Sequence, residues 1–549
     1  MKHLILLLFL ALNTSAYSQA PTDWAWLYGA SGATATSMAT TANGDIYLCG
    51  NFRDTATFGN SIITAAGSMD VFIAKINAAG TIAWLKQIGS TNIERAYAIK
   101  THDHAVYIYG GFTDTLLLGN NKLICNGSED VFVAKLDTAG NYIWAQGGGS
   151  TGKEFIYAKG MTVDKKGNVY ITGDLQTTTT ATFGNATIPG NPYGGFFLVK
   201  YNPSGYTEWA TSGAIDSAHN AAPLDIKADE NDNVYVTGGY SGKLTLGATT
   251  LTGYGDDAFL VKYSPAGNVV WATTIGGNSR TTGMAVCCDK NNNIFVTGQS
   301  YGDLTFSGIT SPGGVSGRNT EIFIAKYDST GNALWARRAG THERNPMYIL
   351  THDMVSDNNG SVYITGGYYD TLDFYNNGVI AQTDKKNQDN VFVAKYDANG
   401  NTLWAIEGGG RGGEAPEALH LSNQSLYVAG SFTNVDSTKF GFHTFKANKT
   451  NNQENLFIAK IANATGIKTA TSGQNNIAVY PNPAENYFVV SGITKGTIIS
   501  VYDIAGKKIK TVTATGNKER IETTGFLKGN YTITVSSATE ELYYRLTKL

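Results

Sequence analysis

The stretch that decides the fold is VYVTGGYSGKLTLGATTLTGYGDDAFLVKYSPAGNVVW, at Val234–Trp271. It contains three apolar segments: VYVTG, which ends in small residues; AFLVK, which ends in a lysine; and a segment that reaches a tryptophan after a Gly/Asn turn. β-Branched and aromatic residues dominate all three, which favours strands over helices. Each segment is apolar on both faces, as in a strand packed between two neighbours. The stretch therefore predicts a small sheet buried on both sides.

The same unit recurs along most of the chain, which is the first pattern to look for in a long sequence. The first strand occurs seven times, at Ile46–Gly50, Val106–Gly110, Val169–Gly173, Val234–Gly238, Ile294–Gly298, Val362–Gly366 and Leu426–Gly430. The second strand also occurs seven times, at Val71–Lys75, Val131–Lys135, Phe196–Lys200, Ala258–Lys262, Ile322–Lys326, Val391–Lys395 and Leu456–Lys460. The tryptophan follows only six of these copies, at Trp84, Trp144, Trp209, Trp271, Trp335 and Trp404. The last unit thus lacks its third element.

The missing tryptophan is found at the other end of the chain, at Trp24 in DWAWLYGASG. An N-terminal strand at about residues 22–29 would pair beside Leu456–Lys460 and complete the seventh unit from both ends of the chain. An open solenoid needs polar caps instead, whereas a closed ring removes exposed sheet edges. The sequence therefore predicts an all-β fold, a seven-bladed β-propeller over residues 21–463 closed by an N-terminal strand.

The repeat length is about 63 residues, more than the 40–45 that four strands need in compact propellers. The surplus lies between the two aromatic strands, as at Thr55–Gly67, and predicts an added hairpin or lengthened middle strands. With its GNxYVTG, aFvaKyd and GxxxW elements, the chain resembles the bacterial β-propeller repeat family, also called SBBP repeats, over roughly residues 22–460. The resemblance implies a fold and almost nothing about activity, because propellers host many functions.

Both ends of the chain differ from the repeats. Residues 1–20 read as a secretory signal peptide, with Lys2 and His3, an apolar run at Leu4–Leu12, and small residues before the preferred cleavage site after Ala20. Residues 464–476 form a Thr/Ser/Gly/Asn linker. Residues 477–549 alternate strands and turns, which predicts a small β-sandwich.

The motifs of this tail stand in a fixed order: YPNP, VYDIAGKKI, LxxGNYTITV and a Lys-Leu end. Together they resemble the type A sorting domain of the Bacteroidetes type IX secretion system. The residues that carry the resemblance are Tyr480, Pro481, Asn482, Pro483, Gly506, Lys507, Gly529 and Tyr531. The resemblance implies export across the outer membrane with the type IX machinery as partner, followed by release or attachment to the cell surface.

Composition excludes several classes of protein. The formal charge is −3 and the pI is near 6.3, so no basic face for nucleic acid is expected. No segment after the leader is long and apolar enough for a membrane helix. The four cysteines do not make a disulfide framework in so long a chain. The propeller should therefore be held together by aromatic and aliphatic packing.

Acidic residues at the starts of the units are the first choice for a ligand surface. Glu94, Glu154 and Glu414 stand ten residues after Trp84, Trp144 and Trp404, and Asp216 and Glu343 lie in the equivalent loops. Variable loops on a rigid scaffold commonly carry function. A merely solvated face is the competing interpretation. The ligand would be an unidentified extracellular glycan or protein.

Other residue patterns allow a chemical interpretation and a structural one. His102 and His104 would share one face of a strand and could ligate a metal, or lie in a solvated loop. Asp229–Asn233, Asp289–Asn293 and Asp357–Gly360 resemble fragments of calcium loops but lack the downstream Glu, so turns are expected, with no metal site and no cofactor. The Cys287–Cys288 pair fits either a buried strand or, by resemblance, a quinone-dependent dehydrogenase with a vicinal disulfide.

Asp-Ser/Thr followed by a small or apolar residue recurs, which resembles the O-glycosylation sequon of exported Bacteroidetes proteins. The copies begin at Asp54, Asp114, Asp137, Asp216, Asp328, Asp370 and Asp436. Turn chemistry explains the same dipeptides.

Three functions remain after the sequence is read. The first is a non-catalytic extracellular binding or scaffold protein, since no nucleophile–base–acid set is seen. The second is a propeller enzyme that acts on polysaccharide, which a convergent pair of buried carboxylates in the central funnel would favour. The third is a quinoprotein oxidoreductase.

Overall fold

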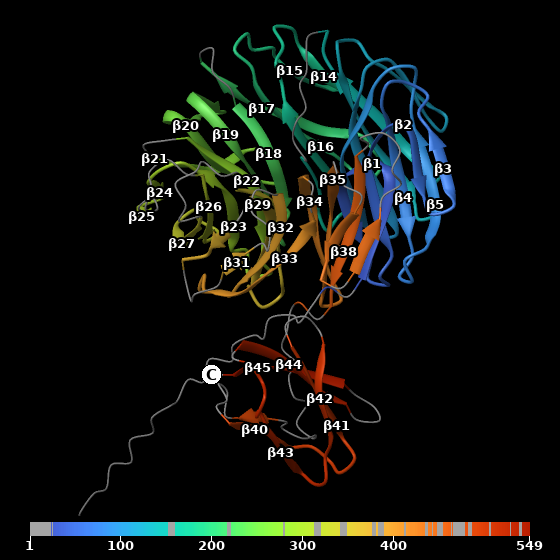
Figure 1. Ribbon diagram of the computed structural model, residues 1–549. Coiled ribbons are helices and arrows are strands. Elements are labelled where there is room, and N and C mark those ends of the chain that lie inside the picture. Colours follow the sequence, from blue (N-terminus) through green and yellow to red (C-terminus); the bar gives the residue numbers. More distant parts are fainter. Residues whose placement is uncertain are drawn as a thin grey trace, which may run out of the picture. The chain divides into compact units, whose positions relative to one another are not determined.

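Strands are the only regular elements in the part of the chain that the computed structural model describes (Figure 1). The chain divides into two compact units, Met1–Gly466 and Ile467–Leu549, which are described separately below. The described residues are 24, 26–151, 160–216, 221–277, 280–311, 320–340, 349–369, 371–375, 380–382, 389–410, 413–433, 437–441, 443–446, 454–462, 464, 478–480, 486–503, 507–527, 529–536 and 541–548. The predicted leader, residues 1–20, and all of the predicted linker except residue 464 lie outside them.

Within Met1–Gly466, the described residues form seven antiparallel repeat units. The inner strands are β1 (Trp26–Thr40), β6 (Glu94–His102), β12 (Met161–Val163), β18 (Ala221–Ala228), β22 (Thr281–Cys288), β28 (Leu350–Ser356) and β34 (Gly413–Ser422). Each pairs with a second strand: β2 (Ile46–Phe58), β7 (Ala105–Phe112), β13 (Val169–Asp174), β19 (Val234–Leu246), β23 (Ile294–Ser300), β29 (Val362–Tyr369) and β35 (Ser425–Thr433).

The third strands carry the terminal lysines. They are β4 (Asp70–Ile76), β10 (Asp130–Asp137), β16 (Gly195–Tyr201), β20 (Thr249–Tyr263), β26 (Glu321–Tyr327), β32 (Asp389–Tyr396) and β38 (Asn455–Ile461). The outer strands are β5 (Ile82–Ile88), β11 (Tyr142–Gly149), β17 (Thr207–Ile215), β21 (Val269–Gly277), β27 (Ala333–Ala339) and β33 (Thr402–Gly410). Each inner strand contacts that of the next unit, and β34 contacts β1.

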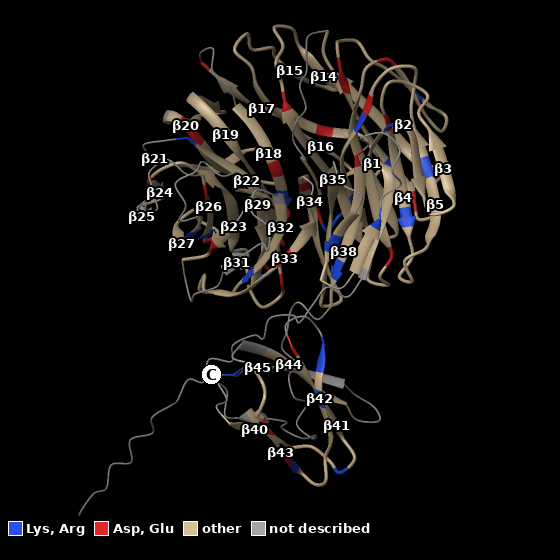
Figure 2. Ribbon diagram, viewed as in Figure 1, with Lys and Arg blue, Asp and Glu red and all other residues tan. Residues whose placement is uncertain are grey.

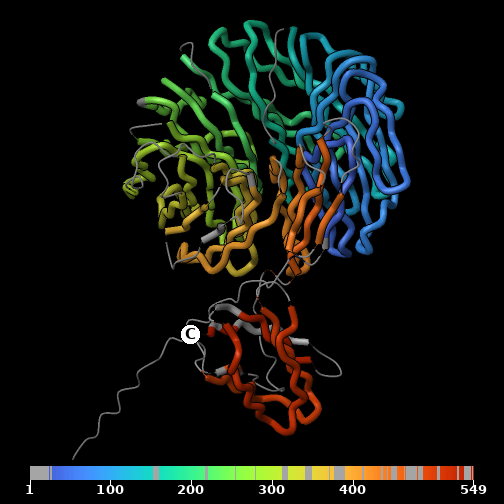
Figure 3. The backbone as a smooth tube through the Cα atoms, in the orientation of Figure 1, coloured from blue at the N-terminus to red at the C-terminus, as the bar shows by residue number. Residues whose placement is uncertain are grey.

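Strand β1 belongs to two units. Its first part, Trp26 to Ser31, pairs with Lys460 to Asn455 of β38, and its second part pairs with β2. Figure 3 shows this N-terminal blue segment beside the orange strands of the last unit. The structure therefore contains the predicted pairing between the N-terminal strand and Leu456–Lys460.

The register corrects which tryptophan completes the seventh unit. Trp26 lies opposite Lys460, just as Trp84 lies opposite Lys75, so Trp26 and not Trp24 takes the repeat position. Residues two apart in a strand share a face, so the sequence pattern could not separate the two. Trp24 is buried instead against Phe440, with ring centroids 4.8 Å apart, and its Nε1 donates to the carbonyl of Glu407 at 2.8 Å.

Hydrogen bonds from a tryptophan or lysine side chain to a backbone carbonyl join neighbouring units at several junctions. In unit 2 the Trp144 Nε1 and the Lys135 Nζ donate to the same carbonyl, that of Pro203 in unit 3, at 3.1 and 3.3 Å. The Lys135 ammonium also lies 5.3 Å from the ring centre of Tyr107. The equivalent lysine lies over the equivalent ring in the other six units (Lys75, Lys200, Lys262, Lys326, Lys395 and Lys460). Figure 2 colours lysine and arginine blue on the ribbon, with blue positions on β4 and β38. The repeated Lys and Trp are thus contacts between units as well as core residues.

Glycine is required in the turn of unit 3 against which the Trp144 ring packs. Gly205 has a φ of 86°, and a Cβ added there would lie 2.7 Å from the Trp144 ring. The tight turn and the indole therefore both exclude a side chain at this position.

The surplus residues of each unit form hairpins or lengthened strands. Separate hairpins comprise β8 (Thr115–Leu118) with β9 (Asn121–Ile124), β14 (Ala181–Phe183) with β15 (Ala186–Ile188), β24 (Leu304–Phe306) with β25 (Ile309–Ser311), β30 (Thr371–Asp373) with β31 (Ile380–Gln382), and β36 (Ser437–Phe440) with β37 (His443–Lys446). The ends of β2, β19 and β20 are lengthened, and β3 (Ser61–Thr64) pairs with β2. Most of these extensions pair with the outer strand of the preceding unit, as Phe183 does with Gly148.

The C-terminal unit has its own core between two antiparallel sheets. One sheet contains β39 (Ala478–Tyr480), β40 (Tyr487–Ser491) and β43 (Lys518–Glu522), and the other contains β41 (Ile498–Tyr502), β42 (Lys508–Thr513), β44 (Gly529–Ser536) and β45 (Glu541–Lys548). Phe488 and Val490 of the first sheet pack in one cluster with Ile499, Val501 and Ile533 of the second. This unit therefore buries a hydrophobic core of its own.

Candidate functional site

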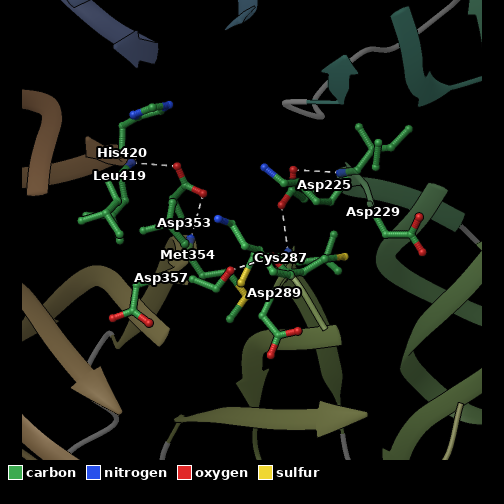
Figure 4. A pocket seen from close by; sticks show the side chains of 18 of the residues that line it. Asp225, Asp229, Cys287, Asp289, Asp353, Met354, Asp357, Leu419 and His420 are labelled. Carbon is green, nitrogen blue, oxygen red and sulfur yellow. Dashed lines mark hydrogen bonds between the residues drawn. The ribbon is translucent and has the colours of Figure 1, made fainter. Parts of the chain in front are cut away.

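A cavity of about 300 Å³ lies among the inner strands β6, β18, β22, β28 and β34 (Figure 4). Strands from five different units contribute to it. Its lining includes Lys100, Asp225, Lys227, Asp353 and His420, so charged groups far apart in the sequence meet in it.

Asp225 and Asp353 hold equivalent positions and make equivalent hydrogen bonds. The Asp225 carboxylate accepts from its neighbour Ile226 N and from Val286 N of the next unit, both at 2.8 Å. The Asp353 carboxylate accepts from Met354 N at 2.8 Å and from Leu419 N of the next unit at 2.7 Å. Each carboxylate therefore links two inner strands through backbone N–H groups.

Burial and neighbouring charges shift the pKa values of the ionisable groups that line the cavity. Burial, followed by the charge of Asp353, raises the pKa of Asp225 to about 6. Burial lowers the pKa of Lys100 below its usual value. Burial, with the charges of Lys100 and Lys227, lowers the pKa of His420 to about 3, and its Nδ1 lies 2.7 Å from the Thr40 hydroxyl. At neutral pH His420 is therefore an uncharged imidazole.

The Cys287–Cys288 pair lies in the strand β22, opposite Phe295 and Ile294. Both thiols are free, Cys287 is buried, and burial raises the pKa of each. The thiolate, the reactive form of cysteine, is therefore disfavoured at both positions. The pair has the surroundings of the buried strand that the sequence suggested.

A second cavity, of about 500 Å³, lies where the inner strands of units 6 and 7 begin. Thr36 of β1, His352 of β28 and Glu417 of β34 line it together with Glu414 and Glu454. The His352 Nδ1 lies 3.9 Å from the Glu417 Oε1. This cavity brings polar side chains of units 1, 6 and 7 together.

The predicted acidic loop residues fall into three groups. Glu94 and Glu414 are buried, with 0% and 3% of their surface exposed, and burial raises the pKa of Glu94. Glu94 accepts from Ser90 N at 2.7 Å, so it fixes its own loop, whereas Glu414 lines the second cavity. Asp216 is exposed and accepts from Lys243 N at 3.3 Å. Glu154 and Glu343 lie outside the described residues. Their binding role stays a prediction.

The calcium-loop fragments are turns. The Asp229 carboxylate accepts from Asn231 N, Asn233 N and the Tyr235 hydroxyl at 2.8–3.0 Å. Asp289 and Asp357 cap their turns in the same way. These carboxylates are therefore engaged by the turns themselves, as expected from Asx chemistry.

Of the two interpretations of His102 and His104, the structure agrees with the loop and not with a shared strand face. Strand β6 ends at His102, and Asp103 and His104 form the turn with φ values of 47° and 60°. A left-handed turn breaks the two-residue alternation that the prediction assumed. Within the described ranges no group of three or more His, Cys, Asp or Glu is placed to hold a metal ion.

The glycosylation-like dipeptides lie mostly in turns and hairpin starts. The Asp137 and Asp328 carboxylates accept backbone N–H groups of their own turns. Residues 217, 218, 370 and 436 lie outside the described part of the chain. Glycosylation of these segments stays a prediction.

Few of the sorting-motif side chains are described. Tyr531 is buried, its ring lies 5.0 Å from that of Phe526, and its hydroxyl donates to the carbonyl of Leu527 at 2.7 Å. Lys507 closes a turn by donating its backbone N–H to Asp503. Tyr480 and Gly529 lie in β39 and β44, while Pro481, Asn482, Pro483 and Gly506 are outside the described residues.

Two known families match parts of the chain. Residues 478–548 match the secretion system C-terminal sorting domain, and residues 150–174 match the β-propeller repeat. The chain thus carries a type IX sorting domain at its C-terminal end and a matched β-propeller repeat within its repeat region. The sorting domain marks it for export by type IX secretion to the cell surface or the extracellular space. Among the described residues, no helix is long and apolar enough to cross a membrane.

More distant similarities are weak or partial. An uncharacterized WD repeat-containing protein of Acanthamoeba polyphaga mimivirus is 25% identical over 461 residues, which cover 69% of this chain and 32% of that protein. The regulatory protein FlaEY of Caulobacter vibrioides is 28% identical over 215 residues, covering 36% of this chain and 21% of its own. The chain thus spans about a third or less of the length of these curated relatives.

Solved structures show only a loose likeness. PorZ of Porphyromonas gingivalis, a surface component of the type IX secretion system, has a TM-score of 0.25 and 12% identity, covering 94% of this chain and 81% of its own. Drosophila Semaphorin 2a has a TM-score of 0.37 and 9% identity, covering 97% and 99%.

The cavity residues Lys100, Asp225 and His420 were not visible as site candidates in the sequence. Their signal becomes visible only when the inner strands are aligned by register. At the position of Asp225 and Asp353, the four other units with a described bulge carry small residues (Ser37, Ala98, Ala285 and Ala418).

Proposed function

We propose that this protein is a seven-bladed β-propeller, closed by its N-terminal strand, that acts outside the cell as a non-catalytic binding or scaffold module. The observation that carries the proposal is the sorting domain at residues 478–548 behind a repeated β-scaffold. A protein exported by type IX secretion works on extracellular or surface material.

Two structural features support a closed ring. The N-terminal strand pairs with β38 over six residues, and the first and last inner strands are in contact. A tryptophan Nε1–carbonyl hydrogen bond recurs at five junctions between neighbouring units, from Trp84, Trp144, Trp209, Trp271 and Trp335. A ring of this kind would leave no sheet edge exposed at its junction.

The binding role is supported by what the inner strands present. The Lys–aromatic and Trp–carbonyl contacts repeat from unit to unit. The residues that line the two cavities differ in charge and size. A rigid repeated frame with variable inward residues is suited to recognition. The segments that carry Glu94, Glu154, Asp216, Glu343 and Glu414 would border this ligand surface.

The test uses the full-length exported protein on a glycan array and in a pulldown from surface and extracellular material. Saturable binding that leaves the bound material chemically unchanged supports a binding module. No saturable ligand in either assay would reject it. A heat-unfolded sample of the same protein is the control for adhesion through unfolded chains.

An extracellular polysaccharide-acting enzyme is the second candidate, because Asp225 and Asp353 converge in one cavity. The raised pKa of Asp225 is typical of a general acid beside a second carboxylate. Against this role, each carboxylate already accepts two backbone N–H groups at 2.7–2.8 Å. Those hydrogen bonds account for both residues as links between strands.

One degradation assay distinguishes the enzyme from the binding module. If polysaccharide is degraded, and Asp225→Asn and Asp353→Asn abolish degradation while the variants stay folded, the protein is an enzyme. The binding proposal expects no degradation by either the native protein or the variants.

A further inference from the structure

The inner strands share a β-bulge at one register. In each of β1, β6, β18, β22, β28 and β34, one residue is left out of the pairing with the second strand. These residues are Thr36, Tyr97, Leu224, Met284, His352 and Glu417; in unit 3 the preceding segment, 152–159, lies outside the described residues. Bulges are used to re-aim a side chain next to functional sites.

The bulged residues differ from their neighbours in size and exposure. The residues just before them are Ala35, Ala96, Pro223, Gly283, Thr351 and Pro416, which are all small or compact. Each of the six bulged residues is half-buried, while the residue on either side is fully buried in most strands. Each of these units therefore presents one larger, partly accessible side chain at the same level of its inner strand.

The bulge ring, meaning these six residues, has a polar and an apolar arc. Thr36, His352 and Glu417 come from the consecutive units 1, 6 and 7 and line the cavity of about 500 Å³. Leu224 and Met284 come from units 4 and 5. Tyr97 of unit 2 lies between the arcs, and its hydroxyl donates to Glu129 at 3.0 Å.

The charged groups that line the cavity of the polar arc are mainly acidic. Glu414, Glu417 and Glu454 line this cavity, and its described lining contains neither lysine nor arginine. A cationic group entering the cavity would meet carboxylates in a partly desolvated setting, where attraction is stronger than in water. An anionic group would be repelled.

We propose that the bulge ring binds a basic and partly apolar segment of a protein partner. A lysine or arginine side chain of the partner lies against Glu417 and His352, and an adjacent aliphatic side chain lies against Leu224 and Met284. This inference rests on the proposed binding function and adds the site and the chemistry of the ligand.

The test measures two matched peptides against the full-length protein by calorimetry. The probes are acetyl-Leu-Lys-Leu-Lys-amide and acetyl-Leu-Glu-Leu-Glu-amide, which share their apolar residues and differ in charge. The basic peptide should bind and the acidic peptide should not. Glu417→Gln should weaken binding of the basic peptide by about tenfold, since one carboxylate of the contact is lost. Met284→Ala should weaken it as well.

Glu208→Gln is the control, because it removes an acidic side chain on the outer strand β17, where Glu208 pairs with Lys200. It should leave peptide binding unchanged, and circular dichroism should show that both Gln variants are folded. Equal binding of the two peptides, or equal binding by native protein and Glu417→Gln, overturns the inference.

The outcome is separable from that of the proposed function. If the array or pulldown finds a glycan or protein whose binding is unaffected by Glu417→Gln, the binding function is supported and the site for a basic segment is rejected. If no ligand of any kind is found, both proposals are rejected.

Discussion

Trp144 illustrates how single residues stabilise the junction between two units. Its indole is 8% exposed, contacts Tyr107, and donates to the carbonyl of Pro203 in the next unit. Trp84, Trp209, Trp271 and Trp335 make the same hydrogen bond at their own junctions. The stability of the repeat unit is therefore coupled to that of its neighbour.

We expect Trp144→Phe to lower the free energy of unfolding by about 1–3 kcal/mol, from the lost hydrogen bond and the smaller ring. Denaturant unfolding followed by fluorescence of the remaining tryptophans measures the change. Ile143→Ala, at the adjacent position that is 56% exposed, is the matched control and should stay within about 0.5 kcal/mol of the native protein. Equal effects of the two substitutions would contradict the role of the indole.

His420 should make the native fold sensitive to mild acid. Its pKa is lowered from 6.5 to about 3 by burial and by Lys100 and Lys227. The folded state therefore binds fewer protons than the unfolded state between these pH values, and stability is lost as the pH falls below 6.5. Asp225, whose pKa is raised to about 6, contributes a slope of the opposite sign, with stability lost as the pH rises toward 6.

Comparison with His420→Gln isolates the histidine contribution, because Asp225 is common to both proteins. From pH 6.5 to pH 5 the native protein should lose about 1–2 kcal/mol more than the variant. Unfolding in denaturant at several pH values gives the difference. Parallel pH profiles would show that His420 is not buried as a neutral group.

The residues of the repeat could be predicted from sequence, whereas the cavity residues could not. Lys75 and Trp84 belong to motifs that recur along the chain, so their shared environment was visible as a pattern. Asp225 and Asp353 each replace a small residue at a position set by a β-bulge. A bulge shifts the register by one residue without any fixed sequence signal, so their convergence appears only in three dimensions.

At the scale of elements, β1 is the strand that joins the two ends of the repeat region. Its pairing with β38 was predicted from the missing tryptophan, but the register was not, and Trp26 takes the place expected of Trp24. The hairpins were predicted as surplus length. Their pairing with the preceding unit was not, because partners of short strands are set by tertiary contact.

A chain that begins at Ala30 should lose on the order of 3–5 kcal/mol of stability, since it lacks Trp24 and four of the six strand residues that pair with β38. A synthetic peptide of residues 24–31 should restore thermal stability when added in excess, because it binds only the folded state. Thermal unfolding with and without the peptide measures both effects. A scrambled peptide of the same composition should have no effect; rescue by it would contradict specific pairing.

At the scale of the whole molecule, the chain divides into a repeat region and a C-terminal unit. The C-terminal unit has its own hydrophobic core and matches the sorting family at residues 478–548. Its motifs were visible in sequence because they are local and stand in a fixed order. The ligand of the propeller region was not visible, because the lining of the central cavities comes from several units at once.

Deletion of residues 478–548 should abolish export and leave the propeller region in the periplasm. Cell fractionation with an immunoblot of the propeller region measures this. As a reciprocal control, residues 467–549 fused to a periplasm-targeted reporter should bring the reporter to the surface or the medium. Export of the deleted chain at the native level would contradict the assignment of the tail.

Hydrogen exchange of the full-length protein, with and without the ligand captured in the pulldown, tests the central claim most directly. The account predicts that protection on ligand binding is confined to the inner strands, at β1, β28 and β34 around Thr36, His352 and Glu417. Protection of the outer hairpins with unchanged inner strands would contradict a central binding site, and so would the absence of any saturable ligand.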